Sequence, residues 1–356
     1  MSNIREVARL AEVSVATVSR TLQQPDLVSL KTRNKVLAAV KAAGYKPNLM
    51  AVRFRSGKTH NLVVLVPTVA NVFFARVISG MQEAAHDNQY ALLLGNTLGD
   101  DEMEAAYARM VQTSQADGLI QLRAHNPFDA LQQPDTGDEA PALLPMVNAC
   151  EVLDKAPCPT VVLDNRAAAC AMTEHLLALG HRRIAMIKGP ARSPLTRDRV
   201  AGYRDALEAA GVPFAAELLS PGNFSLQSGF DAAADLLALP NPPTAIFCEN
   251  DEMAIGAIQR IKQQGLRVPA DISVAGFDDI SFAAFADPPL TTIAQPAEEF
   301  GRTAVRLLID VLEGKLSKAP KVILPFDLVI RASTGPAPGA HQQQPDLQQK
   351  DQPDKS

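Results

Sequence analysis

The sequence reads NIREVARLAEVSVATVSRTL over residues 3–22, and this stretch decides how the N-terminal part of the chain folds. Its first half places apolar residues at the i, i+3, i+4, i+7 spacing of an amphipathic helix. Asn3, followed three residues later by Glu6, has the pattern of a capping box at the start of that helix. Ser14 is a favoured N-cap for a second, short helix. The stretch therefore predicts a helix-turn-helix.

The predicted second helix has an outer face of small and polar side chains. Its apolar positions are Val15, Val18 and Leu22, which leaves Ala16, Thr17, Ser19 and Arg20 on the outside. Small side chains let a helix lie deep in the DNA major groove, where hydroxyl groups and an arginine reach base edges or phosphates. This face therefore indicates DNA binding.

A third predicted helix starts after Ser29 and ends at Gly44, with Val36, Leu37 and Val40 facing a shared core. Three amphipathic helices also occur in bundles that bind nothing, so charge has to decide. Residues 1–58 hold 11 Lys and Arg against 3 Asp and Glu, whereas the remaining residues hold 23 against 36. A basic head on an acidic body is typical of a module that binds nucleic-acid phosphates.

The rest of the chain changes pattern twice. Residues 47–58 are basic, and Asn48 can cap a helix of about two turns, which is too short to be stable alone. From Asn61 onward, short apolar runs alternate with helical patterns, and the series restarts at Thr160. This pattern predicts two parallel-sheet subdomains that face each other across a cleft. From about Gly335 almost no apolar residues remain, which predicts a disordered tail.

Several classes of protein are disfavoured by the composition. The four cysteines show no C-x-x-C spacing and no companion histidine cluster, so neither a zinc site nor a disulfide scaffold is expected. The chain has no apolar run of membrane-spanning length and no signal-peptide core, which predicts a cytoplasmic protein. It also lacks phosphate-binding glycine motifs and a Gly-x-Ser-x-Gly elbow. We therefore expect no enzyme activity, catalytic residue, cofactor or metal.

Seven runs of sequence resemble, in order, the lactose/galactose repressor family of bacterial transcription regulators. They are VSVATVSR (13–20), TRNKV (32–36), GYKPN (44–48), GHRRIA (180–185), NDEMAIG (250–256), SVAGFDD (273–279) and PPLTTI (288–293). The resemblance covers the chain from Ile4 to about Ser333. It implies a small all-α helix-turn-helix head, a hinge helix, and an α/β core of two parallel-sheet subdomains like that of periplasmic binding proteins.

The expected boundaries follow from the pattern and the resemblance together. We expect a DNA-binding domain over residues 1–46, a hinge helix or linker over 47–58, a ligand-binding and dimerisation core over 59–334, and a disordered tail over 335–356. Within the core, one subdomain is expected over 59–162 plus 290–323 and the other over 163–289 plus 324–334. These limits place the three crossings between subdomains near Asp164, Pro289 and Pro325.

The resemblance implies two groups of DNA contacts in the head. The residues that enter the major groove would be Val15, Ala16, Thr17 and Arg20, although Val15 can also be a packing residue. The residues that seat the head on phosphates would be Ser14, Ser19, Asn34 and Tyr45. The first group would select the sequence and the second mostly the affinity.

In the hinge, most family members carry a Leu that wedges into the minor groove, but this chain has Phe54 at that position. An apolar Phe can be inserted between base steps, with Arg53 near the phosphates. The alternative, that Phe54 packs on the core or on a dimer mate, stays open.

The resemblance also implies a ligand site in the cleft. Arg199, Asn250 and Asp278 match the family's effector-binding positions, and together they offer the donors and acceptors that a ring of hydroxyl groups needs. Phe73 or Phe74 and Phe224 would sandwich a sugar or a base. Phe74 can equally belong to the core, and Asn148 is a further candidate at the rim.

The expected function is a sequence-specific transcriptional repressor. It would act as a homodimer on operator DNA, in the bacterial cytoplasm and at the nucleoid when bound, with no membrane partner. Its effector would be a nucleoside such as cytidine. Three alternatives stay open: a pentose or hexose effector, a sugar-binding sensor without DNA function, and a second transcription factor bound nearby.

Overall fold

The computed structural model describes residues 3–45, 58–131, 144–153 and 158–338. The chain divides into two units, Met1–His60 and Asn61–Ser356, which we call the head and the core. Arg53, Phe54 and the rest of the expected hinge helix up to residue 57 lie outside the described residues, as do residues 339–356 of the expected tail.

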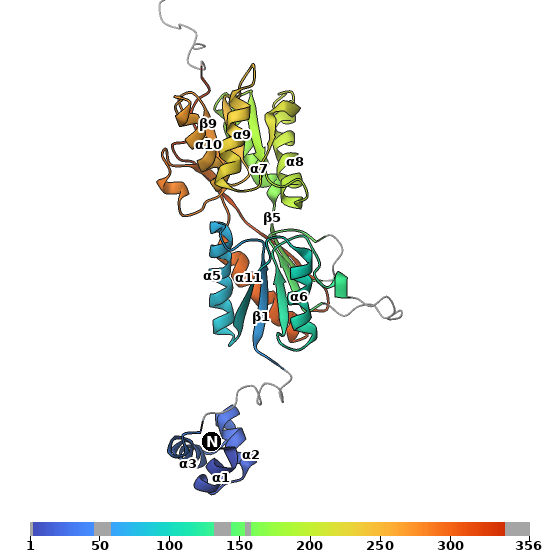
Figure 1. The fold of residues 1–356 in the computed structure, drawn as a ribbon, viewed down its shortest axis with the longest axis vertical. Helices are drawn as coiled ribbons and strands as arrows, with labels where there is room; N and C mark the ends of the chain where they lie inside the picture. The colour runs from blue at the N-terminus through green and yellow to red at the C-terminus, as the bar shows by residue number, and fades with distance from the viewer. Residues whose placement is uncertain (1–2, 46–57, 132–143, 154–157, 339–356) are drawn as a thin grey trace, which may run out of the picture. The chain divides into compact units, whose positions relative to one another are not determined.

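The described residues of the head form three α-helices and one 3-10 turn (Figure 1), namely α1 (Ile4–Ala11), α2 (Val15–Gln23), η1 (Pro25–Leu27) and α3 (Leu30–Ala43). Each α-helix is preceded by a capping residue whose side-chain oxygen accepts the backbone N–H three residues later. The caps are Asn3 for α1, Ser14 for α2 and Ser29 for α3. The capping box of α1 is only half formed, because Glu6 pairs with Arg9 instead of returning to the N-cap.

The core of the head is formed by small and β-branched residues. Its buried members are Val7, Ala8, Ala11, Val18, Val36 and Ala39. Leu37, expected to face inward, is instead 48% exposed. The helical stripe of α3 passes through Val36, Ala39 and Val40, and Leu37 lies about 100° away from Val36 around the axis.

The core unit is built on two six-stranded sheets, which confirms the expected fold class. In the first sheet the strand order is β11 (Lys321–Leu324), β5 (Thr160–Leu163), β4 (Met146–Ala149), β3 (Gly118–Gln121), β1 (Asn61–Val66), β2 (Ala91–Asn96). In the second it is β12 (Asp327–Val329), β10 (Thr291–Ala294), β9 (Ser273–Asp278), β8 (Ala245–Cys248), β6 (Ile184–Lys188), β7 (Leu219–Pro221). Every pairing is parallel except that of β10 with β12.

Helices accompany each sheet (Figure 1). The N-terminal subdomain combines the first sheet with α5 (Val72–Asp87), α6 (Asp101–Gln112), α11 (Ala297–Leu312) and the short η2 (Asp129–Leu131). The C-terminal subdomain combines the second sheet with α7 (Asn165–Ala178), α8 (Pro194–Ala209), α9 (Leu226–Leu237), α10 (Asp251–Gln263) and the short η3 (Ala216–Leu218) and η4 (Ala283–Phe285). No helix in the described ranges is long and apolar enough to cross a membrane.

The chain passes between the subdomains at three places, and one differs from expectation. The crossings follow β5, β10 and β11. The second was expected at Pro289, but β10 begins at Thr291 and pairs in parallel with β9, so the chain leaves the C-terminal subdomain only at Gln295 and Pro296. Residues 290–294 therefore belong to the C-terminal subdomain. Pro288 and Pro289 end a loop within this subdomain and do not mark its boundary.

The start of the expected tail is also different. The Ala337 amide donates to the carbonyl of Leu179 at 2.9 Å, and the Gly335 carbonyl lies 3.1 Å from Nε2 of the buried His181. Residues 335–338 thus have a defined place on the C-terminal subdomain, because neighbouring polar groups satisfy their backbone. This reduces the range to which the disorder prediction can apply to 339–356.

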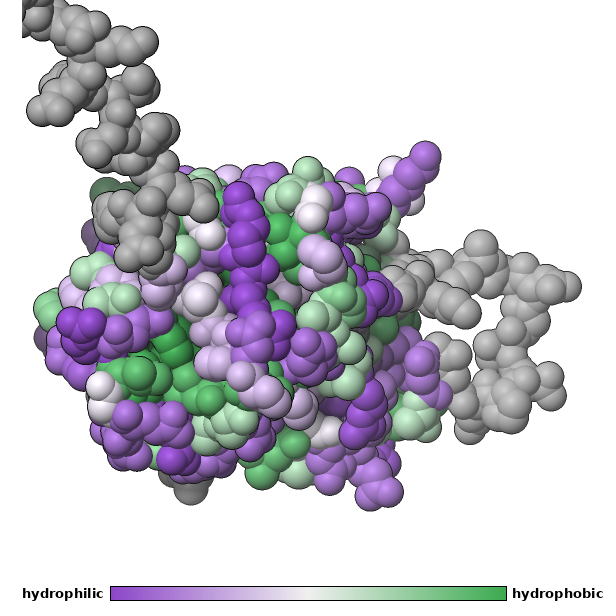
Figure 2. Space-filling view, turned by 90° about the horizontal axis from the view of Figure 1, so that it is seen from above, coloured by the Kyte–Doolittle hydropathy of each residue, from purple (hydrophilic) through white to green (hydrophobic). Residues whose placement is uncertain are grey.

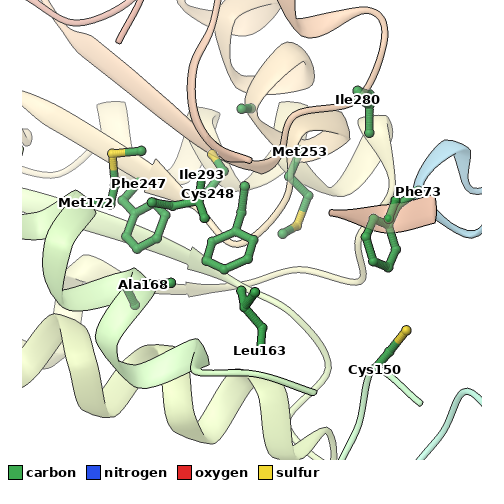
Figure 3. Packing of buried hydrophobic residues seen from close by; sticks show 14 of the residues in the cluster. Phe73, Cys150, Leu163, Ala168, Met172, Phe247, Cys248, Met253, Ile280 and Ile293 are labelled. Carbon is green, nitrogen blue, oxygen red and sulfur yellow. The ribbon is translucent and has the colours of Figure 1, made fainter. Parts of the chain in front are cut away.

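The apolar core lies between the sheets and their helices. In Figure 3, Phe247, Ile293, Met172 and Leu163 gather in the core, with Phe73 and Cys150 to one side. In the N-terminal subdomain, α5 and α11 approach closely, since a Cβ at Gly80 would collide with the Glu298 carbonyl. These two helices therefore form a tightly packed pair.

Candidate DNA interface and ligand cavity

The predicted groove-reading face of α2 is open to solvent. Ser14, Val15, Ala16 and Arg20 are exposed, while Thr17 and Ser19 are half-buried. Val15 is 40% exposed, so part of its side chain is open to solvent and part is packed. The hydroxyls of Ser14 and Thr17 lie 2.8 Å apart at the helix start. This geometry leaves the first turn of α2 without bulky obstruction.

The two other predicted seating residues lie on and after α3. Asn34 is exposed, and Tyr45 is half-buried against the apolar core of the head. Ion pairs in the head join Arg9 to Glu6, Arg33 to Asp26 and Lys35 to Glu12. In the part of the head that the structure describes, Arg20, Lys31 and Lys41 enter no ion pair. These cations are available to phosphates.

A cavity of about 850 Å³ lies between the two subdomains. Its walls come from the loops and helix starts that follow the carboxyl ends of the parallel strands, the usual ligand position in such sheets. Six of the seven predicted ligand residues line it: Phe73, Phe74, Arg199, Phe224, Asn250 and Asp278. The volume falls within the range typical of small-molecule sites.

Helix starts from both subdomains point at this cavity. Asn71 caps α5 by accepting the Phe73 amide at 2.9 Å, and Asn250 caps α10 by accepting the Met253 amide at 3.0 Å. The positive ends of the helix dipoles favour acceptor-rich groups there. They offset part of the negative charge of Glu252 and Asp278 in the cavity wall.

Arg199 is buried at the cavity wall and held from three sides. Its Nε donates to Oδ1 of Asn165 at 2.9 Å, Nη1 donates to the Glu249 carbonyl, and the guanidinium stacks 3.6 Å from the centre of the Phe277 ring. Burial lowers the pKa of Arg199, while the carboxylates of Asp278 and Glu249 oppose that effect. The side chain is therefore preorganised, with little freedom to lose on binding.

Asp278 ends β9 in a left-handed conformation, with φ of 114°. Its Oδ1 accepts a 2.6 Å hydrogen bond from Nε2 of Gln295. Burial raises the pKa of Asp278 to about 7, against the opposing effects of Arg199 and of the Gln295 hydrogen bond. Burial also raises the pKa of Glu249 to about 7. The cavity thus contains and adjoins carboxyl groups that change charge near neutral pH.

The three predicted aromatic residues differ in their freedom. Phe73 is 7% exposed and packs edge-on against Phe300, so most of its ring belongs to the core. Phe74 is half-buried and offers more of its ring to the cavity. Phe224 has φ of 67°, and its carbonyl accepts the Asn250 side-chain amide at 2.9 Å. Its ring lies so close to Gly189 that a Cβ there would collide with it.

Asn148 is not placed as expected. It is fully buried and does not line the cavity. Its Nδ2 donates to the carbonyls of Gln121 and Arg123, at 3.2 and 2.8 Å. The reason is that β3 and the loop after it lie beside β4, and their backbone carbonyls bind the Asn148 amide away from the cleft.

Sequence reasoning missed three carboxylates of the cavity wall, Asp101, Glu151 and Glu252. Glu151 accepts the Ala124 amide at 2.6 Å and the Ser193 hydroxyl at 2.5 Å. Glu252 accepts the backbone N–H of Val72, while its Oε1 is buried and has no hydrogen-bond partner in the part of the chain that the structure describes. The position of Glu252 directly after the Asn-Asp pair was an available signal.

One further group of possible metal ligands borders the cavity. Asp101, Glu104 and His125 bring their ligand atoms within 4.8 Å of one another. However, Nη1 of Arg123 lies 2.6 Å from Oε1 of the buried Glu104, and Nδ1 of His125 lies 2.6 Å from its Oε2. The charge of Glu104 is thus already compensated by side chains.

Comparison with known proteins matches both units. Residues 3–48 match the bacterial regulatory proteins of the lacI family, and residues 173–334 match a periplasmic binding protein-like domain. The repressor CytR of Escherichia coli K12 is 39% identical over 337 residues, which are 95% of this chain and 97% of the relative. The regulator DegA of Bacillus subtilis is 34% identical, covering 94% and 98%.

Solved structures of similar proteins agree with these family matches. The lac repressor dimer bound to operator and an anti-inducer matches with a TM-score of 0.82 and 29% identity, over 94% of this chain and 99% of that one. A lacI-family regulator from Enterococcus faecium with bound ribose matches with a TM-score of 0.68 and 27% identity, over 78% and 99%. Five short runs in the sequence, at residues 73–74, 127–129, 145–147, 242–245 and 287–289, also resemble the cytidine repressor of enteric bacteria, in agreement with the E. coli match.

Proposed function

The chain belongs to the lacI family of bacterial DNA-binding transcriptional regulators, and we propose that it is a repressor whose operator binding is controlled by a small hydroxylated ligand in the cavity between its subdomains. One observation carries this proposal. The same chain joins a basic head with an open α2 face to a cavity lined by a buried arginine, an amide and a carboxylate.

On DNA, we propose that Val15, Ala16, Thr17 and Arg20 contact base edges, because they form the open side of α2. Ser14, Ser19, Asn34 and Tyr45 would then position the head on phosphates. Phe54 would enter the minor groove and Arg53 would contact nearby phosphates. Both roles rest on the sequence alone.

In the cavity, a nucleoside such as cytidine is the effector that we favour. Its ribose hydroxyls suit Arg199, Asn250 and Asp278, which supply both donors and acceptors. Its base suits Phe74 and Phe224, whose rings border the same space. The 39% identity to a repressor named for cytidine regulation supports this choice. Asn148 is left out of the proposed ligand set, because it is fully buried and does not line the cavity.

A pentose or hexose is the second candidate. It is favoured by the similarity to a regulator that holds ribose and to one in complex with cellobiose. A free sugar would fill the polar part of the cavity but not the space between Phe74 and Phe224. Calorimetric titration of the full chain with cytidine, adenosine, ribose and ribitol decides between the two candidates.

The dimer that the proposal requires has a suitable surface on the C-terminal subdomain. Figure 2 shows an apolar hollow on a largely polar face. A groove of about 460 Å³ is lined by Leu226, Phe230, Ile255 and Ile258 from α9 and α10, and by Ala286 next to η4. Phe285 beside it is 87% exposed. An exposed apolar surface of this kind marks an interaction site, and a second copy of the chain is the occupant that we propose.

For the mechanism, we propose that the ligand prefers one arrangement of the two subdomains, and that this preference changes the spacing of the two heads in the dimer. The ligand can shift the equilibrium only by its difference in affinity for the two arrangements. Two heads about one helical turn apart would read a near-palindromic operator.

The decisive test is an electrophoretic shift assay with genomic fragments, at several salt concentrations and with each ligand. We expect binding that weakens steeply as salt rises, because a strongly basic head that neutralises phosphates releases bound cations from the DNA. We also expect one class of ligand to change the affinity. A dimer that ignores DNA at low salt would instead be a sugar-binding sensor. A shift that appears only with a second transcription factor would mean that the chain depends on a neighbour.

A further inference from the structure

We propose that Arg76 is a positioning residue: from the N-terminal subdomain, it fixes the backbone that holds the ligand-binding carboxylate Asp278 in the C-terminal subdomain, and so couples ligand binding to the arrangement of the subdomains. This inference rests on the proposed ligand cavity. Arg76 is not a cavity-lining residue and would act through Asp279.

Arg76 is first fixed within its own subdomain. Its Nε and Nη2 each donate to a different carboxylate oxygen of Glu298, both at 2.9 Å. Arg76 lies on α5 and Glu298 on α11, the closely packed pair of helices. A bidentate pair of this kind sets the plane of the guanidinium as well as its position. The third nitrogen, Nη1, therefore points in a defined direction.

That direction leads to the other subdomain. Nη1 donates to the backbone carbonyl of Asp279 at 2.9 Å. Asp279 is the residue after Asp278, and its own carboxylate is held by Nη2 of Arg331 at 2.7 Å. Two arginines thus bind Asp279: Arg331 from the C-terminal subdomain and Arg76 from the N-terminal subdomain.

The backbone conformation of Asp278 and Asp279 is one that needs contacts from surrounding residues to persist. Asp278 has φ of 114° and Asp279 has φ of 52°. Both values lie in the positive-φ region, which is unfavourable for residues other than glycine. Such conformations persist only where surrounding contacts hold them. The Ile280 amide donates to Oδ2 of Asp251 at 2.8 Å, and Arg76 holds the carbonyl just before it.

The bond from Arg76 to Asp279 exists only while α5 and the end of β9 stay at this separation. If a ligand drew the subdomains into another arrangement, this bond would break or shorten with it. The contact therefore makes the position of Asp278 depend on the arrangement of the subdomains. By reciprocity, what binds Asp278 then biases the arrangement.

Arg76→Gln tests the proposal, because it keeps a polar side chain but removes the fork. The matched control is Arg302→Gln. Arg302 also joins α11 to α5, through its 3.0 Å bond to Glu83, and it bonds Glu299 on its own helix at 2.8 Å. No bond of Arg302 to the C-terminal subdomain is seen in the described residues. Arg76→Lys is a second variant that keeps the charge and a single donor, in case the Gln variant folds poorly.

Two readouts are needed. The first is amide hydrogen exchange of Asp279 and Ile280 in the full chain without ligand, which does not depend on the proposed function. We expect faster exchange in Arg76→Gln and unchanged exchange in Arg302→Gln. The second is the ratio of operator affinities with and without the effector found by titration. We expect this ratio to fall about fivefold or more in Arg76→Gln, the low end of typical allosteric couplings, and less in Arg76→Lys.

The proposal is overturned if Arg76→Gln leaves both readouts as in the wild type, or if Arg302→Gln changes them equally, which would indicate general loosening of the α5 and α11 pair. A wild-type chain that responds to no ligand would overturn the proposed function. The exchange data would then still show whether Arg76 holds the Asp278 backbone.

Discussion

The carboxylate of Glu151 accepts a 2.5 Å hydrogen bond from the hydroxyl of Ser193, and this bond joins the two subdomains at the wall of the cavity. Glu151 follows β4 in the N-terminal subdomain, and Ser193 caps α8 in the C-terminal subdomain. The contact is charge-assisted, and such hydrogen bonds contribute more than neutral ones. It therefore favours the arrangement seen in this structure.

We expect Ser193→Ala to change the effector affinity by roughly tenfold, since a hydrogen bond to a charged group contributes about 1.5 kcal/mol or more. Isothermal titration calorimetry measures the effector affinity of each variant. Ser193→Thr is the control, because it keeps a hydroxyl and an N-cap residue. Equal affinities for the Ala and Thr variants would show that the bond does not bias the subdomains.

The buried carboxyl groups of Asp278 and Glu249 should make the stability of the core fall as pH rises from about 4.5 to about 7, and they add no further slope above that. Burial raises the pKa of Asp278 and of Glu249 to about 7, so the folded chain binds more protons than the unfolded chain between their ordinary values and about 7. Their stabilising effect is present at low pH and is lost as pH rises through about 7. His175 and His181, whose pKa values burial lowers, act in the opposite direction below about 6.5.

Urea denaturation between about pH 4.5 and 8.5 checks this expectation, because the range spans the fall and the plateau above it. Asp278→Asn and Glu249→Gln should each flatten the fall in unfolding free energy. Asp271→Asn should not, because its exposed ion pair with Arg267 lowers the pKa of Asp271 to about 2, outside this window. A slope that survives both buried substitutions would contradict the assignment.

Arg20 and Asn34 should differ in how they affect DNA binding. Arg20→Ala should weaken operator binding by about 1 to 3 kcal/mol and relax the protein's preference at one base pair, as loss of a base contact does. Asn34→Ala should weaken all sequences alike, because phosphate contacts carry no sequence information. Binding to a library of operator variants at fixed salt separates the two effects. A uniform loss for Arg20→Ala would place it with the phosphate contacts.

Gly189→Ala should disturb the cavity through Phe224. A Cβ at Gly189 would collide with the Phe224 ring, so we expect the ring to move and the effector affinity to fall about tenfold, which corresponds to about 1.4 kcal/mol. In a Phe224→Ala background the added methyl has room and should cost little more. This double-mutant cycle isolates the contact. Additive losses would mean that Gly189 acts by another route.

Phe285→Glu should convert the dimer to a monomer. The ring is 87% exposed beside the apolar groove of α9 and α10, and a charge in the middle of an apolar interface is costly. Sedimentation velocity at micromolar concentration measures the change. Ile323→Glu, at a 58% exposed position on β11, is the control and should stay dimeric. A dimer that persists in Phe285→Glu would move the interface elsewhere.

Much of this molecule is determined by its sequence alone. The stripe of α1, the caps at Asn3, Ser14 and Ser29, and the apolar runs of β1 and β9 depend on spacing within a few residues, so they could be predicted from the sequence. Family motifs then identified Arg199, Asn250 and Asp278, which the structure brings to one cavity. Motif residues of this kind follow the carboxyl ends of parallel strands, which meet at one edge of the sheet.

Tertiary pairing decided the rest. The crossing was expected at Pro289, but β10 stays with β9 because its backbone finds a partner in that sheet. Asn148 points to the carbonyls of Gln121 and Arg123, because pairing of β4 with β3 brings those carbonyls within reach of its amide. The contacts of Glu151 with Ser193 and of Arg76 with Asp279 join residues 42 and 203 positions apart. Local periodicity sets which face of an element is apolar, but only the packed fold sets which polar groups meet across a cleft.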